Sequence, residues 1–124
     1  MVPAPFVYRA KVESVYDGDT LTAVLDLGMA ITRKCSCRLA GIDTPEVNSR
    51  VAAEKQAALL ARNRLQELTL DKQVILESIE KPDKYGRLLV RIWTLEGVCV
   101  NDALLSENLA RPYDGGAKTS WEMT

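Results

Sequence analysis

The chain has 124 residues, of which 47% are hydrophobic and 27% are charged, a composition typical of one globular domain with a single core. It carries 16 lysines and arginines against 17 aspartates and glutamates, which excludes proteins that hold nucleic acid through a dense positive surface. No apolar run reaches the ~20 residues of a membrane helix, and no signal peptide is visible at the N-terminus, so the compartment stays open.

The first part of the chain alternates between apolar and polar residues, which is the pattern of half-buried strands. The alternation predicts a first strand around Tyr8 to Glu13 and a second strand over Leu21 to Leu27. Between them, Asp17-Gly18 is a hairpin signal, although the same dipeptide is a simple turn in many proteins. A third strand is expected from about Ile31 to Leu39.

Within the third strand, one face carries Ile31, Cys35, Cys37 and Leu39. Arg38 is expected on the face opposite the core, at the end of the strand. Two cysteines on one face are typical of small buried apolar groups. With three cysteines in the chain and no histidine, the four ligands of a structural zinc site are not supplied.

A long helix and two more strands are expected next. A stretch rich in Ala, Leu, Glu, Gln and Arg predicts a helix over about Val51 to Leu68, with Ser49 or Asn48 as its N-cap. The fourth strand is expected over Val74 to Ile79 and the fifth over Arg87 to Leu95, with a turn-rich connector between them.

The C-terminal part begins with a second, shorter helix. Asn101 is a good N-cap for a helix over about Asp102 to Asn108. The segment from Arg111 to Thr124 contains proline and two adjacent glycines, and we interpret it as loop.

Five short strands with a helix between the third and fourth predict an α+β chain, mainly β, folded as a five-stranded OB-type barrel with a short helix near the C-terminus. A closed barrel removes the edge strands that an open sheet would expose. An α+β sheet with helices on one side fits the pattern nearly as well. In either case we expect a single domain over residues 1–124, with irregular tails at 1–6 and 114–124.

The segment from Arg38 to Glu46 combines a cation, two carboxylates and a proline-stiffened turn. Thr-Pro flanked by acids is also a common way to leave a strand, so a plain turn is the competing interpretation. Asp19 and Arg87 lie at other strand ends, and a barrel can bring such ends together. Carboxylates without histidine or thiolate nearby select calcium or magnesium over zinc.

These residue types suit phosphodiester hydrolysis. Asp19 and Asp43, with a main-chain carbonyl and waters, would fill a calcium shell. Glu46 would then lie just outside that shell, where a carboxylate orients or deprotonates an attacking water. Arg38 and Arg87 would stabilise the negative charge that builds on the phosphoryl oxygens.

Four motifs resemble the staphylococcal nuclease (thermonuclease) family in identity and order. They are Asp17-Gly18-Asp19-Thr20, Arg38 through Glu46, Asp83-Lys84-Tyr85-Gly86-Arg87 and Val100-Asn101-Asp102-Ala103-Leu104. The resemblance covers about Val7 to Tyr113. It implies an OB-type barrel and a calcium-dependent endonuclease that hydrolyses phosphodiester bonds of DNA and RNA by metal-assisted attack of water, leaving 3′-phosphate ends.

The resemblance also implies roles for individual residues. It assigns one Ca²⁺ ion to Asp19, Asp43 and the Thr44 carbonyl, catalysis to Arg38, Glu46 and Arg87, and substrate binding to Lys84, Tyr85 and Tyr113. The tyrosines would stack on bases or donate hydrogen bonds, and the lysine would contact a terminal phosphate. DNA and RNA, preferably single-stranded or frayed, are the implied partners of a monomer that has no membrane association.

Three alternatives stay open at the level of sequence. Tyr85-Gly86 is equally consistent with a turn that carries a surface aromatic. Trp121 either packs the tail onto the barrel or offers a surface for a base. The alternative function is a catalytically silent OB-type module that binds nucleic acid or protein. Loss of the catalytic glutamate or of either arginine would mark such a module, and all three residues are present.

Overall fold

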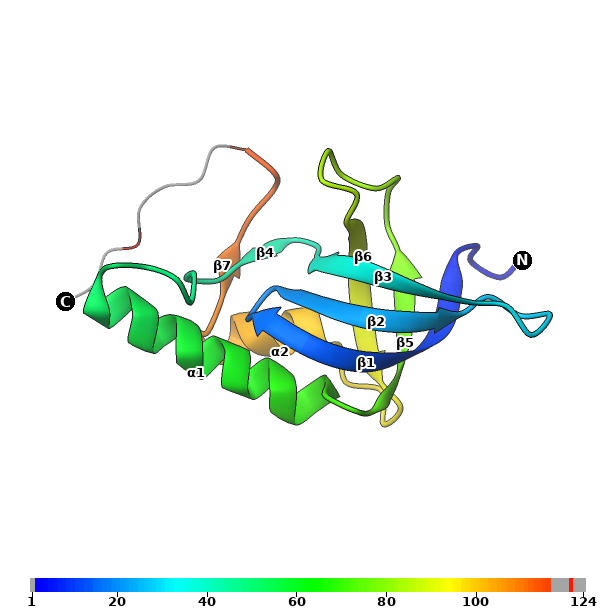
Figure 1. The fold of residues 1–124 in the computed structure, drawn as a ribbon, viewed down its shortest axis with the longest axis horizontal. Helices are drawn as coiled ribbons and strands as arrows, with labels where there is room; N and C mark the ends of the chain where they lie inside the picture. The colour runs from blue at the N-terminus through cyan, green and yellow to red at the C-terminus, as the bar shows by residue number, and fades with distance from the viewer. Residues whose placement is uncertain (1, 117–120, 122–124) are drawn as a thin grey trace.

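The computed structural model describes residues 2–116 and 121, and within that range five strands close into a barrel in the order β1-β2-β3-β6-β5 (Figure 1). The barrel strands are β1 (Val7–Asp17), β2 (Thr20–Asp26), β3 (Thr32–Leu39), β5 (Gln73–Ser78) and β6 (Leu88–Thr94). Neighbouring strands are antiparallel except β3 and β6, which run parallel. The predicted OB-type barrel is therefore confirmed, and the open sheet is wrong.

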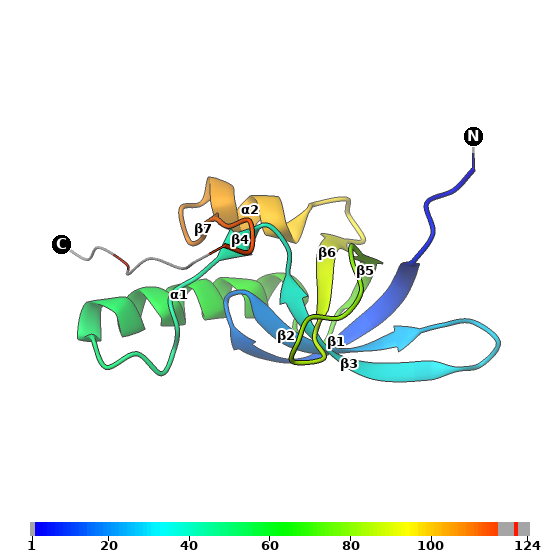
Figure 2. The same cartoon turned by 90° about the horizontal axis from the view of Figure 1, so that it is seen from above.

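The core fills the barrel with the inward half of each alternating strand. Fully buried side chains come from every strand, namely Val12, Leu21, Ala23, Cys37, Leu39, Val74, Leu76, Val90 and Ile92. The helix α1 (Ala52–Thr69) runs along one side of the barrel and buries Ala58, Ala61 and Leu65 (Figures 1 and 2). Because small alanines face inward on α1, the helix approaches the β1–β2 turn closely.

The strands β2 and β3 stop short of the tip of the hairpin that joins them, since β2 ends at Asp26 and β3 begins at Thr32. Leu27 and Ile31 were expected inside strands, yet both lie outside them and are exposed. The ladder ends because Gly28, Met29 and Ala30 all have positive φ, of 82°, 55° and 62°. They form a tight tip that Figure 2 shows projecting from the barrel.

The start of α1 differs by a few residues from the expected one. Val51 is the N-cap and is exposed, so it does not belong to the apolar face. Ser49, an expected N-cap, lies two residues before this position. Its hydroxyl accepts the N–H of Val51 at 3.1 Å and donates to Glu54 at 3.0 Å, so it still stabilises the entry to the helix.

The second helix, α2 (Val100–Ser106), begins two residues earlier than predicted, with Cys99 as its N-cap. Asn101 is therefore inside the helix and fully buried. Its side chain accepts the N–H of Ile92 and donates to the carbonyls of Ala40 and Val90. These long-range hydrogen bonds outweigh the capping preference of asparagine, and they fix α2 against β6 and the end of β3.

A second, two-stranded sheet was not predicted. It pairs β4 (Ile42–Asp43) with β7 (Arg111–Pro112), in a segment that we had interpreted as loop. Figures 1 and 2 place this sheet beside the β1–β2 turn, at the end of the barrel opposite the β2–β3 tip. Among the described residues, no helix is long and apolar enough to cross a membrane.

Candidate functional site

Three predicted residues meet at the end of the barrel that carries β4 and β7. Arg38 Nη1 forms an ion pair with Asp19 Oδ2 at 3.1 Å and donates to the Leu39 carbonyl at 3.3 Å, and Arg38 Nη2 is 3.7 Å from Asp43 Oδ1. Asp19 lies in the β1–β2 turn, Arg38 is the second-to-last residue of β3 and Asp43 lies in β4. The guanidinium therefore spans the two carboxylates that sequence reasoning assigned to a metal.

The surroundings of Arg38 add burial to the expected position on the face opposite the core. The side chain does point away from the barrel core, but the residue is only 5% exposed. It is buried because the turn at Asp19 and the β4 strand lie against it, and the Tyr113 ring centroid is 5.7 Å from its guanidinium carbon. Tyr113, expected to bind substrate, thus lies beside the buried cation.

Two aspartates hold the loop that follows β4. Asp19 Oδ2 accepts the N–H of Thr44 at 3.0 Å, and Asp17 Oδ1 accepts the N–H of Val47 at 3.0 Å. Glu46 lies between these two anchors and is exposed. Asp17 is therefore more than a turn residue: it and Asp19 fix both ends of the segment that presents the Glu46 carboxylate.

Gly18 lets this turn and loop approach the helix α1. A Cβ atom at this position would lie 2.6 Å from the Cβ of Ala61 and 2.9 Å from Cγ2 of Thr44. Both distances are far inside van der Waals contact. Only glycine allows Asp17 and Asp19 to reach the loop while α1 packs behind them.

We expect Gly18→Ala to lower the free energy of unfolding by about 1–3 kcal/mol, because the added methyl overpacks a closed interface. Chemical denaturation measures this loss. Adding Ala61→Gly removes the closest contact and should recover part of the stability. An unchanged denaturation midpoint for Gly18→Ala would show that the turn can move away from α1 without cost.

The other predicted residues form a second group on the loop before β6. Arg87 pairs with Asp83 through Nε at 2.9 Å. The Tyr85 ring, 71% exposed, lies 5.2 Å from Lys84 Nζ and 5.4 Å from the Arg87 guanidinium carbon. This group presents an aromatic face flanked by two cations at the start of β6, the strand that pairs with β3 so that Leu89 is opposite Arg38.

Asp83 organises this second loop. Burial alone would raise the pKa of its carboxyl, but the N–H groups of Arg87 and Tyr85 and the Arg87 side chain all donate to it, and they lower the pKa below its ordinary value. The carboxylate stays ionised and closes the turn, which keeps Arg87 at the entry to β6.

Arg111 was missed by sequence reasoning. Its Nε and Nη2 both donate to Asp43 Oδ2, at 3.1 and 2.9 Å. Trp121 lies over this guanidinium, with 3.9 Å between the guanidinium carbon and the ring centroid. Trp121 therefore packs against Arg111 of β7, whereas the rest of the segment after residue 116 lies outside the described residues. No local pattern marks Arg111, because its partner is 68 residues away.

The donor set at the buried cluster fits a hard cation. Asp19, Asp43 and Thr44 offer only oxygen, and burial raises the pKa of the Cys37 thiol to about 12, so no thiolate competes. Within the described residues, Arg38 Nη2 and Thr44 Oγ1 are buried without a hydrogen-bond partner. Within the same residues, no three His, Cys, Asp or Glu side chains gather as a metal site. Any ion would thus need oxygen atoms from water or substrate as well.

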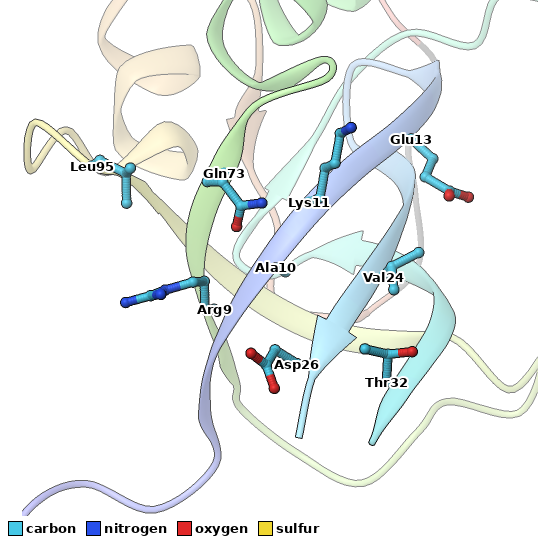
Figure 3. A pocket seen from close by; sticks show the side chains of 9 residues that line it. All are labelled: Arg9, Ala10, Lys11, Glu13, Val24, Asp26, Thr32, Gln73 and Leu95. Atoms are coloured by element: carbon cyan, nitrogen blue, oxygen red, sulfur yellow. The ribbon is translucent and has the colours of Figure 1, made fainter. Parts of the chain in front are cut away.

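A separate hollow lies over the outer face of β1 and β2 (Figure 3). Its lining mixes cations and anions, among them Arg9, Lys11, Glu13 and Asp26. None of the predicted site residues lines it, and its mixed charge favours no one class of ligand.

Comparison with known families found a match. A profile of the family described as staphylococcal nuclease homologue matches residues 36–122, more than half of the chain. The matched segment includes Arg38, Asp43, Glu46 and Arg87, whereas Asp19 lies before it. No curated protein matches the chain at a significant level.

Proposed function

The chain belongs to the family of staphylococcal nuclease homologues, and on that premise we propose that it is a calcium-dependent endonuclease that hydrolyses DNA and RNA to leave 3′-phosphate ends. The family and the closed barrel already indicate a nuclease-type OB domain. The observation that carries the finer proposal is the buried guanidinium of Arg38 between Asp19 and Asp43, next to a loop that presents Glu46.

Asp19, Asp43 and the carbonyl of Thr44 would hold the ion. When bound, a calcium ion would polarise a phosphoryl oxygen and favour the ionised form of a nearby water. Glu46, exposed and anchored on both sides, would orient that water or take its proton. Arg38, whose Nη2 still has a proton to donate, would stabilise charge on the phosphoryl oxygens.

The charge balance of the cluster supports dependence on a cation. Arg38 and Arg111 neutralise Asp19 and Asp43, so these four residues carry no net charge together. A buried neutral cluster attracts a phosphodiester weakly. The cluster gains positive charge only when a divalent cation is present, and we therefore expect nucleic acid to bind tightly only together with the cation.

The second group would receive the nucleotide next to the scissile bond. Tyr85 offers an exposed ring on which a base can stack, and Lys84 and Arg87 flank it with positive charge. Stacking needs an unpaired base, so single-stranded or frayed ends are the preferred substrates. We expect the chain to act as a monomer.

Digestion of plasmid and of single-stranded DNA and RNA in calcium, in magnesium and in chelator tests this function. We expect cleavage in calcium and none in chelator. Because cleavage should leave the phosphate on the 3′ end, the new 5′ ends should carry no phosphate and should accept a 5′ label directly. Cleavage that persists in chelator contradicts the proposal. DNA that is shifted on a gel but never cut would favour the silent binding module instead.

Arg87→Ala should slow calcium-dependent cleavage by about 10²-fold or more, since it removes one charge from the transition state. Arg33→Ala is the matched control, because Arg33 is an exposed cation on β3 outside both groups. Initial rates under saturating substrate separate the two variants. Equal rates would remove Arg87 from the catalytic residues.

A further inference from the structure

Arg111 is tied to Asp43 by backbone and side chain together. β7 pairs antiparallel with β4, and in this register Arg111 is directly opposite Asp43. The guanidinium then reaches across the pair, with Nε and Nη2 both on Asp43 Oδ2. The Asp43 side chain is 2% exposed and that of Arg111 is 27% exposed, so the contact is shielded from water on the carboxylate side.

The two oxygens of Asp43 have different neighbours. Oδ2 accepts the two hydrogen bonds from Arg111, whereas Oδ1 is the oxygen near Arg38 Nη2. Arg38 also contacts Asp19 Oδ2, so Oδ1 of Asp43 belongs to the side that faces Asp19. The hydrogen bonds from Arg111 therefore set the rotation of the carboxylate and direct one oxygen toward the other proposed ligand.

Arg111 is itself held in place. The Trp121 ring stacks on its guanidinium at 3.9 Å, and this contact fixes the plane of the fork. Lysine could not reproduce the arrangement, since its ammonium is a compact point charge and lacks the rigid pair of N–H donors that converge on Asp43 Oδ2.

We propose that Arg111 is a positioning residue, which holds Asp43 in the orientation that binds the divalent cation, with Trp121 locking Arg111. Metal-binding carboxylates commonly depend on such outer hydrogen bonds, and losing one lowers metal affinity by about 10–100-fold. The inference rests on the proposed function, because it assigns the metal to Asp43. It adds a residue that lies outside the predicted site.

Isothermal titration of Ca²⁺ into the full chain, without nucleic acid, tests the inference. We expect Arg111→Gln to weaken calcium binding by about 10–100-fold, and Arg111→Lys to weaken it nearly as much. Arg91→Gln is the matched control: Arg91 also pairs with an aspartate, Asp102 at 3.1 Å, and lies 5.6 Å from the centroid of Trp93. The control should bind calcium as the wild type does.

Thermal melts in chelator show which variants fold. If Arg111→Gln is unfolded, Trp121→Leu serves in its place, because it leaves the fork intact and should weaken calcium binding several-fold. Unchanged or tighter binding in a folded Arg111→Gln overturns this inference alone and would make Arg111 a competitor of the ion. A wild-type chain that binds neither calcium nor magnesium overturns both this inference and the metal dependence of the proposed function.

Discussion

Arg38→Ala is expected to lower the free energy of unfolding by about 3–5 kcal/mol and to slow cleavage by roughly 10²–10³-fold. The loss of stability arises because Asp19 and Asp43, both nearly fully buried, lose the cation that spans them. The loss of rate arises because Arg87 alone then remains of the two guanidinium groups proposed to stabilise the phosphoryl charge. Urea denaturation in chelator and cleavage rates in calcium measure the two effects separately.

Arg38→Lys separates charge from geometry. An ammonium supplies the same charge and can contact one aspartate, so the stability loss should be smaller than for Arg38→Ala. It cannot contact both carboxylates and a phosphoryl oxygen at once, so activity should stay close to that of Arg38→Ala. Arg33→Lys, an exposed change on the same strand, controls for the general effect of the substitution. If a folded Arg38→Lys cuts at the wild-type rate, the positive charge of Arg38 is sufficient for activity and the geometry of its guanidinium is not required.

The barrel was predictable because its strands are amphipathic. Alternation around Val12, Ala23 and Cys37 reports which face is buried, and each of these side chains is in the core. A local pattern of period two survives folding wherever one face of a strand meets the core and the other meets water. The same logic failed at Ile31, where three consecutive residues with positive φ end the ladder and leave an apolar side chain exposed.

Features that depend on distant partners were not predictable. Asn101 was expected to cap a helix, but its amide is used between α2, β6 and the turn after β3. Arg111 was expected in a loop, but it pairs with Asp43 across the two-stranded sheet. In both cases the role of one polar side chain depends on partners that are distant in the sequence. A single residue has no periodic pattern from which that role could be predicted.

The candidate site shows the same division. The types of residue could be read from the sequence. The carboxylates of Asp19 and Asp43 suggested a metal cation, and Arg38 suggested a phosphate, before any geometry was known. Their relation could not be read in this way: Arg38 is buried between the aspartates, and Asp17 and Asp19 anchor the loop on which Glu46 lies. Burial and anchoring depend on the closed barrel and on the packing of α1 at Gly18.

Glu46→Gln should slow cleavage with almost no loss of stability, whereas Arg38→Ala should reduce both. Glu46 is exposed, so its replacement by an isosteric amide should change the free energy of unfolding by no more than about 0.5 kcal/mol. Its carboxylate is the proposed base or water-orienting group, and its loss should slow cleavage by about 10²–10⁴-fold. Binding of single-stranded DNA in calcium should stay near the wild-type level, because Asp19 and Asp43 still hold the ion.

Two controls distinguish a chemical role for Glu46 from a general effect of charge. Glu80→Gln removes another exposed carboxylate, outside both groups of site residues, and should cut as fast as the wild type. Glu46→Asp keeps the charge but withdraws the carboxylate by one methylene, and it should also cut slowly, since the anchored loop cannot follow. If Glu46→Asp and Glu46→Gln both cut at the wild-type rate, the water is activated without Glu46, and its carboxylate has no part in the reaction.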